Sequence, residues 1–462
     1  MNTTTRLPFL LPLLGACLLA APGLRAATYN WDPFTNRSNA AGSGPWDTTT
    51  AIWNNGMADV PWSANNDAVF GGADGAYTIT VANGITANNA TFNASGYTLT
   101  GASAAVPGSL TINSAGGLSV AAGKTLTVGA NMTVGLSTYT TLAGTLNAVD
   151  GARLTGPQGQ FFGGIVNVGA GSSVNYSSLL MSGTTVTVNG AGTSFTSLGS
   201  MSVSNSTVTI TQGTFGTQVG NSGFSFSNST VRLNGGTLLY GYGSGNNSGS
   251  TFYLNGGTIQ TGSYPILLNG GTNSMIVQAG GAKIVGGSIT ISASLQHETA
   301  GPVLDGGLSK TGNGTLTLSA ANTYTGGTSV GGGTLAASTN GALGTGDASV
   351  LAVSVSLSIG TGVTNPFNNV LGRLTLAGGG AAGTADAGYL DLTSGANIVV
   401  SRLTLGGTTY SAGVFTSALF PEYIAGTGTV TVVPEPGSFA LVSALAVGLG
   451  ATTRRIRRSR QD

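Results

Sequence analysis

The chain has 462 residues, 78 of which are glycine, and only 6% of its residues are charged. A disordered chain normally carries much charge or proline, whereas this chain alternates Val, Ile and Leu with Thr, so we expect a folded, β-rich protein. Residues 28–433 contain eight Lys or Arg against twelve Asp or Glu, and this mildly acidic balance argues against a nucleic-acid partner, which needs a basic face.

Residues 1–27 are predicted to be a secretory signal peptide. Arg6 precedes a mostly apolar, uncharged run over residues 7–21, and small residues follow at Ala26 and Ala27. Export by the Sec machinery and cleavage by signal peptidase would remove Cys17, the only cysteine, and leave no thiol chemistry. The alternative is a lipoprotein-type cleavage site ending at Cys17, but the apolar run continues past that residue.

Residues 28–75 differ from the rest because they hold all four tryptophans, Trp31, Trp46, Trp53 and Trp62. Stacked coils expose apolar edges at each end of an array, and atypical terminal units must cover those edges. We therefore predict a Trp-rich N-terminal cap. The functional alternative is a carbohydrate site in which Trp46 and Trp53 stack on sugar rings.

Residues 76–305 consist of short alternating runs, such as YTITVANG and TTVTVNGAG, separated by Gly and Asn. Period-2 alternation with turn residues between the runs indicates strands. The runs also recur, because LNGGT has its Asn at residues 234 and 255, 21 apart, and again at residue 269. A period near 20 residues suits one turn of a parallel β-helix, whose coils share a continuous core.

The predicted fold is therefore all-β, a right-handed parallel β-helix or β-solenoid made of degenerate coils. Gly and Asn at the corners tolerate positive φ, and Val, Leu and Ile are expected to point inward and stack on their equivalents one coil away. About 17 coils at ~4.8 Å each would give a rod of roughly 80 Å. The alternative is an array of antiparallel sandwiches joined by Asn-Gly hairpins, which the recurrence disfavours.

Residues 306–337 include SKTGNGTLTLSAANTYTGGTSVGGGTLAA. From Leu308 to Leu335 the chain resembles the autotransporter-associated β-strand repeat of large secreted bacterial proteins. The resemblance implies a passenger-type β-solenoid and a role in surface display or adhesion, with no catalytic residues to transfer. Residues 338–432 form a further predicted β segment, which from residue 403 on resembles the closing segment common in such proteins.

Carboxylates are scarce in the chain, although hydrolases and lyases on β-helices use them for catalysis or to hold calcium. None lies between residues 151 and 297. Asp305 and Asp347 are isolated in the sequence, and Asp386 and Asp391 would point to opposite faces of one strand. We therefore expect no enzyme and no cofactor. A polysaccharide-active β-helix enzyme is the alternative.

His297 is the only histidine, so a His-based metal site would lack partners and a serine triad would have to use this residue. GTSVG at residues 327–331 matches the nucleophile-elbow pattern around Ser329. That elbow needs a strand–turn–helix, and the match lies inside the β-strand repeat. We therefore predict no catalytic residue and no metal ligand.

An aromatic group spans Tyr240, Tyr242, Phe252, Tyr253 and Tyr264. Rings on equivalent faces of neighbouring coils can stack, so we expect an aromatic ladder that supports the solenoid. The alternative is an exposed set, with Tyr240 and Tyr242 in contact with a glycan.

Residues 433–462 form a tail in three parts. Pro434, Glu435 and Pro436 come first, and 17 uncharged residues follow at 437–453. As a helix these would span ~25 Å, just short of the ~30 Å hydrocarbon core. A basic cluster completes the tail: Arg454, Arg455, Arg457, Arg458 and Arg460. Arginines stay on the cytoplasmic side, so the body would lie outside the inner membrane.

This tail resembles the PEP-CTERM sorting signal of Gram-negative bacteria. The resemblance implies recognition of Pro434, Glu435 and Pro436 by a membrane-embedded exosortase. A transient inner-membrane anchor would then be removed and the body delivered to the cell surface or the extracellular matrix. The predicted function is structural or adhesive, with extracellular polysaccharide or other surface proteins as partners. A glycan-binding surface protein is the alternative.

Overall fold

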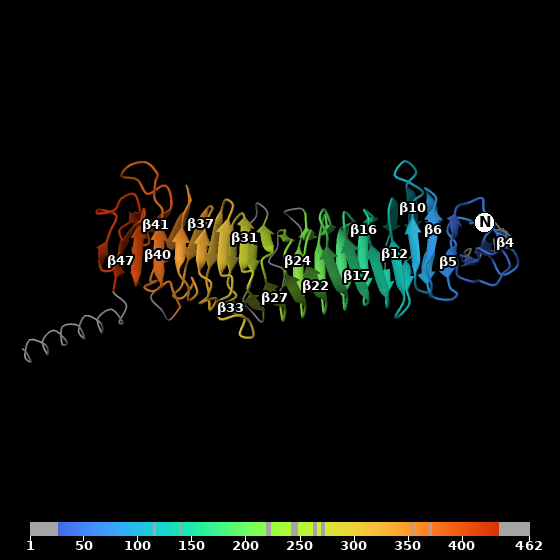
Figure 1. The fold of residues 1–462 in the computed structure, drawn as a ribbon, viewed down its shortest axis with the longest axis horizontal. Coiled ribbons are helices and arrows are strands. Elements are labelled where there is room, and N and C mark those ends of the chain that lie inside the picture. Colours follow the sequence, from blue (N-terminus) through green and yellow to red (C-terminus); the bar gives the residue numbers. More distant parts are fainter. Residues whose placement is uncertain are drawn as a thin grey trace, which may run out of the picture.

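The structure, a computed structural model, describes residues 26–433 except 114–116, 138–139, 219–222, 242–247, 262–265, 269–272, 353 and 369–371. Within these residues the chain is all-β and winds into a parallel β-solenoid of about 13 turns, an elongated rod in Figure 1. Over the same residues no helix is long and apolar enough to cross a membrane. The predicted signal peptide and sorting signal lie outside them, apart from residues 26, 27 and 433.

Each turn of the solenoid runs along three faces in succession. One turn passes from β19 (Thr185–Asn189) on the first face to β20 (Ser194–Ser197) on the second and β21 (Met201–Ser204) on the third. It returns to the first face at β22 (Thr207–Ile210), which pairs in parallel with β19. Side chains of one turn therefore stand directly on those of the next.

The first face is one parallel sheet along most of the rod. Its strands are β2 (Gly44–Trp46), β6 (Tyr77–Val81), β9 (Tyr97–Thr100), β12 (Thr125–Val128), β15 (Thr145–Ala148), β17 (Ile165–Gly169), β19, β22, β25 (Thr230–Leu233), β27 (Thr251–Leu254), β30 (Ser274–Val277) and β33 (Leu295–His297). Near the C-terminal end, β42 (Asn397–Val400) pairs in parallel with β47 (Thr429–Val432).

The second face is continuous over the length of the rod. Its strands are β7 (Ile85–Ala87), β10 (Gly108–Ile112), β13 (Met132–Leu136), the first halves of β16 (Arg153–Phe162) and β18 (Ser173–Ser182), β20, β23 (Thr214–Thr217), β26 (Thr237–Tyr240), β28 (Thr258–Thr261), β31 (Ala282–Gly286), β34 (Leu308–Thr311), β36 (Thr328–Val330), β38 (Ala348–Val350), β40 (Arg373–Leu376) and β43 (Arg402–Leu405). This face carries the groove described below.

The third face is formed by two successive sets of parallel strands. The first set is β1 (Thr28–Trp31), β5 (Asp67–Phe70), β8 (Asn89–Phe92), β11 (Leu118–Val120), β14 (Thr140–Leu142), the second halves of β16 and β18, β21 and β24 (Phe224–Ser227). The second set is β29 (Ile266–Leu268), β32 (Ile289–Ile291), β35 (Thr315–Leu318), β37 (Thr334–Ala337), β39 (Ser356–Ile359), β41 (Tyr389–Leu392) and β46 (Ile424–Gly426).

The core consists of columns of apolar side chains that run along the rod. On the first face Val166 pairs with Val186, Val186 with Val208, and Val208 with Val231, and all four are buried. Each such burial contributes about 1.5–3 kcal/mol. The predicted stacking of inward Val, Leu and Ile is confirmed, because alternation of apolar and polar residues gives most of the described strands one apolar face.

Left-handed backbone occurs at many of the corners, as predicted. Asn131, Asn205 and Asn228 have φ values of 56°, 47° and 47°. Gly96 has φ 90°, and a Cβ there would overlap the carbonyl oxygen of Gly75 on the preceding turn. Asn tolerates the left-handed region and Gly allows close backbone approach.

The 21-residue recurrence is confirmed as a turn, because β25 and β27 pair Leu233 with Leu254. The third LNGGT does not continue it, since Leu268 pairs with Ile291 on the third face. Turns also lengthen toward the C-terminus, where Leu374 pairs with Leu403, 29 residues later. Longer turns and the non-solenoid ends explain why there are about 13 turns rather than the predicted ~17.

Antiparallel pairing, which the alternative fold required throughout, occurs among the described strands only at the two ends. At the N-terminal end β3 (Trp53–Asn54) pairs antiparallel with β1 and with β4 (Asp59–Val60). At the C-terminal end β44 (Thr408–Tyr410) folds back on β43, and β45 (Gly413–Phe415) pairs with β47. Both ends of the rod in Figure 1 therefore depart from the parallel pattern.

Candidate functional site

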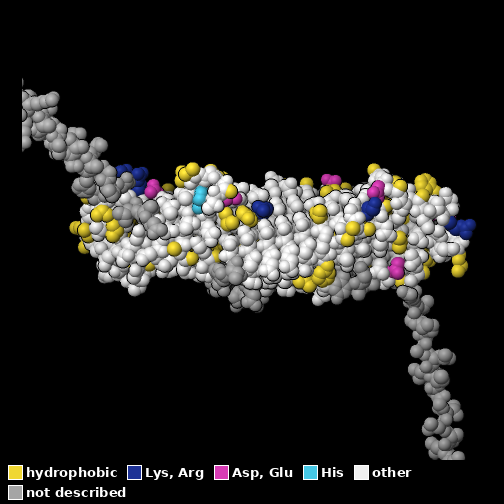
Figure 2. Space-filling view, turned by 90° about the horizontal axis from the view of Figure 1, so that it is seen from below, with side chains coloured by type: hydrophobic (Ala, Val, Ile, Leu, Met, Phe, Trp, Pro, Cys, Tyr) yellow, Lys and Arg dark blue, Asp and Glu magenta, His cyan; other side chains and the backbone are white. Residues whose placement is uncertain are grey.

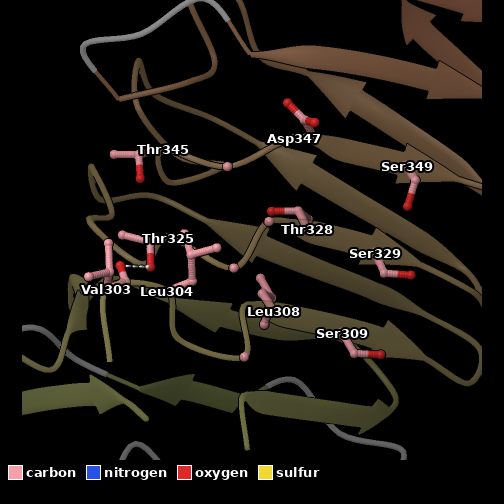
Figure 3. A pocket seen from close by; sticks show the side chains of 14 residues that line it. Val303, Leu304, Leu308, Ser309, Thr325, Thr328, Ser329, Thr345, Asp347 and Ser349 are labelled. Carbon is pink, nitrogen blue, oxygen red and sulfur yellow. Dashed lines mark hydrogen bonds between the residues drawn. The ribbon is translucent and has the colours of Figure 1, made fainter. Parts of the chain in front are cut away.

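A groove of about 720 Å³ lies on the outer surface of the second face, where β34, β36 and β38 lie side by side (Figure 3). The side chains that matter for its chemistry are Val303, Leu304, Ser309, Ser329, Asp347 and Ser349. The corners beside them are rich in glycine, which leaves the floor open to a ligand.

Three serines form a column along the groove. Ser309 of β34 pairs with Ser329 of β36, which pairs with Ser349 of β38, and Figure 3 shows them on successive strands. Neighbouring strands lie about 4.8 Å apart. None of the three hydroxyls has a hydrogen-bond partner among the described residues, so all three remain available to a ligand.

The loop at residues 298–307, between β33 and β34, forms an apolar wall of the groove. Val303 and Leu304 are 88% and 65% exposed, although both belong to a loop that is firmly anchored. The anchor is Asp305, which is only 6% exposed. A rigid loop that displays two apolar side chains resembles a preorganised contact rather than a disordered segment.

All the hydrogen-bonding capacity of the Asp305 carboxylate is used within the protein. Oδ1 accepts from the backbone N–H groups of Gly307 and Gly326, each at 2.8 Å. Oδ2 accepts from the N–H of Thr325 at 2.8 Å and lies 2.9 Å from Nδ1 of His297. The carboxylate thus joins the loop to the neighbouring turn.

Burial of the Asp305 carboxyl by itself raises its pKa. The hydrogen bonds from His297, Thr325, Gly326 and Gly307 outweigh that effect and hold the pKa below its ordinary value. Asp305 is therefore ionised near neutral pH and is a poor candidate for a general acid.

Lys310 is the other buried charged group in this region, with no exposed area. Its Nζ donates to the carbonyls of Thr311, Gly312 and Gly332 at 3.1, 2.8 and 3.0 Å. Burial lowers the pKa of Lys310 below its ordinary value. Because all three ammonium protons have acceptors, this lysine ties β34 to the next turn rather than facing the groove.

The arrangement of His297 and Ser329 does not match a catalytic triad. Ser329 lies in the middle of β36, without the strand–turn–helix of a nucleophile elbow. The Thr325 hydroxyl is 3.3 Å from the same His297 Nδ1 that contacts Asp305. A triad needs the nucleophile and the carboxylate on different ring nitrogens.

The remaining acidic residues are spread along the rod. Asp391 lies in β41 and its carboxylate accepts from Ser358 and Thr393. Asp386 lies in the loop before β41, where it accepts from the N–H of Ala381, so the two do not share one strand as predicted. Across the described residues, no group of three or more His, Cys, Asp or Glu could hold a metal ion.

Three of the aromatic residues considered as glycan contacts are fully buried, which contradicts that alternative. Trp46, Trp53 and Tyr240 have no exposed area, so their rings cannot stack on a surface sugar. The indoles of Trp46 and Trp53 pack against each other 5.1 Å apart, and Tyr240 packs on Phe224 at 4.8 Å.

The other predicted glycan and sorting residues are not placed by the structure. Tyr242 lies outside the described residues. So do Pro434, Glu435 and Pro436 and the predicted basic cluster at residues 454–460.

The fold is an all-β parallel solenoid with a groove on one face. Residues 308–337, which hold β34 to β37 and much of the groove floor, match the family model described as passenger-associated-transport-repeat. The predicted repeat is thereby confirmed over those residues. Searches of curated proteins and of solved structures gave no match. A β-solenoid with such a repeat points to a secreted surface passenger protein.

The groove was not predicted from the sequence. The 20-residue spacing of Ser309, Ser329 and Ser349 was a usable signal, since it equals one turn and places the three on the same face. The wall formed by Val303 and Leu304 had no such signal, because it depends on the loop anchored by Asp305.

Proposed function

We propose that the mature protein is a structural and adhesive β-solenoid of the cell surface or extracellular matrix, whose groove binds neutral glycans. The groove is the observation that carries the adhesive part of this proposal. The passenger-type repeat at residues 308–337 supports a surface location. We take the solenoid to be right-handed, as are about 98% of parallel crossover connections.

The chemistry of the groove favours a neutral polyhydroxylated ligand. Its lining residues include the carboxylate of Asp347 and no Lys or Arg, so an anionic polymer would meet no countercharge. The Asp347 Oδ1 accepts from the N–H of Arg373 at 3.1 Å, and Oδ2 has no partner among the described residues. Carboxylates accept strongly from sugar hydroxyls.

The groove also provides the two kinds of contact that a sugar needs. The column of Ser309, Ser329 and Ser349 repeats once per turn, a length similar to that of one pyranose unit in an extended chain. Val303 and Leu304 offer an apolar surface to the C–H face of a ring. Binding sites for small molecules combine such apolar walls with a few convergent polar groups.

We propose that the role is binding without turnover. The Asp305 carboxylate is saturated by hydrogen bonds and Ser329 has no base beside it, which leaves Asp347 as the carboxylate of the groove. Hydrolysis of a glycosidic bond normally requires a pair of carboxylates. A polysaccharide-active enzyme remains the alternative, and detection of shortened glycans after incubation would favour it.

Calorimetric titration of the purified mature protein with neutral hexasaccharides of glucose, mannose and N-acetylglucosamine tests the adhesive proposal. We expect Ser329→Tyr, which places a ring across the groove, to weaken binding about tenfold or more. Thr187→Tyr, an outward change on β19 of the first face, is the matched control and leaves binding unchanged. Binding that survives Ser329→Tyr, or is confined to hexagalacturonate, contradicts the proposal.

A further inference from the structure

A carboxylate lies buried without any partner in the N-terminal end of the rod. Asp32 follows β1 directly and has no exposed area. Neither Oδ1 nor Oδ2 has a hydrogen-bond partner among the described residues. Its backbone is ordinary, since its N–H donates to the carbonyl of Ile52 at 3.0 Å.

An ionised carboxylate in this state is strongly unfavourable, because a buried charge must be paired, hydrogen-bonded or bound to a metal. The same chain shows the usual solution at Asp305, which is also buried and receives four hydrogen bonds. The two unpartnered oxygens of Asp32 therefore require a cation or a hydrogen-bond donor to compensate the buried charge.

A second carboxylate lies on β4, which is separated from β1 by β3 alone. Asp59 begins β4, and its Oδ1 is buried and has no partner among the described residues. Burial and the negative charge of Asp32 raise the pKa of Asp59 above its ordinary value, while Arg37 opposes this effect. Arg37 itself donates to the carbonyl of Met57 at 3.2 Å, and neither carboxylate takes part in either described ion pair.

We propose that Asp32 and Asp59 bind a calcium ion. Calcium takes hard oxygen ligands and completes its shell with backbone carbonyls, amide oxygens and water. Zinc and copper favour nitrogen or sulfur ligands, whereas the side chains of Asp32 and Asp59 supply only oxygen. Magnesium holds several of its own waters and is poorly suited to the fully buried carboxylate of Asp32.

The position of the two residues gives the ion a structural role. Asp32 adjoins Trp31, which pairs with Trp53 of β3, and Trp53 pairs with Val60 of β4 beside Asp59. An ion shared by Asp32 and Asp59 would fasten β4 to the end of β1. This inference does not depend on the glycan groove, which lies far along the rod.

Tryptophan fluorescence during thermal unfolding of the mature protein reports on this end of the rod, because all four tryptophans lie in residues 28–75. We expect about 5 mM calcium, a concentration suited to extracellular calcium modules, to raise the unfolding midpoint relative to EDTA. The same concentration of magnesium should produce a smaller shift.

Two variants make the test specific. Asp32→Asn and Asp59→Asn should each remove the calcium-dependent shift, and in EDTA Asp32→Asn should unfold at or above the wild-type midpoint because it removes an uncompensated charge. Asp150→Asn, at an exposed corner with φ 55°, is the control that keeps the shift.

The buried indole N–H groups of Trp46 and Trp53 also lack partners, so a water molecule bridging carboxylate and indole is the competing explanation. A midpoint that is the same in calcium and in EDTA would support that explanation and overturn the calcium site. A calcium shift that persists in both Asp32→Asn and Asp59→Asn would overturn it as well.

Discussion

At the scale of single residues, the described part of the rod buries three charged side chains, those of Asp32, Asp305 and Lys310. Lys310 and Asp305 are buried with every donor or acceptor position in use. Each links one turn to the next through backbone groups. The surface in Figure 2 carries few charged side chains on the visible face, and exposed ion pairs contribute little to stability.

The Asp305→Asn variant tests the anchor of the loop at residues 298–307. Whichever carboxylate oxygen the Asn amide nitrogen replaces, it would face N–H donors instead of accepting from them. We therefore expect the free energy of unfolding to fall by about 1–3 kcal/mol at pH 7. Because the folded pKa of Asp305 is depressed, its contribution is complete above the unfolded value of about 3.9 and is lost as pH falls through the folded value.

Urea unfolding of wild type and Asp305→Asn from pH 7 to about pH 2 measures this effect, because the contribution of Asp305 is lost only below the unfolded pKa of about 3.9. The difference between the two proteins should shrink as the pH falls. Asp150→Asn, at an exposed site, provides the matched control. A difference that stays constant over the whole range would show that ionisation of Asp305 does not contribute.

At the scale of the elements, the corner decides whether a turn stacks on its neighbour. Gly84 and Gly96 have similar positive φ values of 81° and 90°. They differ in surroundings, since a Cβ at Gly84 meets nothing within 4 Å, whereas one at Gly96 overlaps the Gly75 carbonyl oxygen. Alanine variants at Gly84 and Gly96 can therefore distinguish the cost of a left-handed backbone from the cost of steric overlap between turns.

We expect Gly84→Ala to cost about 1–2 kcal/mol, the usual penalty for a left-handed residue with a Cβ. Gly96→Ala should cost clearly more, because the backbones of two turns must also move apart. Chemical denaturation of both variants measures the difference. Equal losses at the two positions would mean that the turns are not in tight contact there.

The sequence was sufficient for the features that repeat. The alternation of apolar and polar residues predicted the strands, and the spacing of Leu233 and Leu254 predicted the turn. It was insufficient where a local pattern conflicts with the register. Leu268 of the third LNGGT lies on another face. His297 pairs with the buried Val277 of the preceding turn, a position that no periodicity distinguishes from an apolar one.

The candidate site likewise could not be predicted from the sequence. Asp305 and Asp347 are isolated in the sequence, yet they lie two turns apart beside one groove. Distances between turns become visible only after the register is known, because a one-residue slip moves all the side chains of that strand to the opposite face.

At the scale of the whole molecule, the uniform rod suits a spacer, and the proposed sorting signal at residues 433–462 would decide where it is placed. We expect simultaneous replacement of Pro434, Glu435 and Pro436 by Ala to leave the body folded but retained in the inner-membrane fraction. The reason is that processing would fail while the apolar span still anchors the chain.

Mass spectrometry of the C-terminus after cell fractionation measures this outcome. Wild-type protein recovered from the surface should lack Arg454–Arg460, and the triple variant should keep them. Replacement of Pro421 and Glu422 by Ala, just upstream in the folded part, is the matched control. An intact arginine-rich C-terminus on the exported wild type would contradict the sorting proposal.

The parallel stacking of turns has a mechanical consequence. The hydrogen bonds between turns point along the rod, so tension applied at its two ends loads them one turn at a time instead of shearing many together. A turn of about 20 residues occupies ~4.8 Å of rod and extends to roughly 70 Å when peeled off. A tether of this kind lengthens stepwise under load and absorbs work while the remaining turns stay wound.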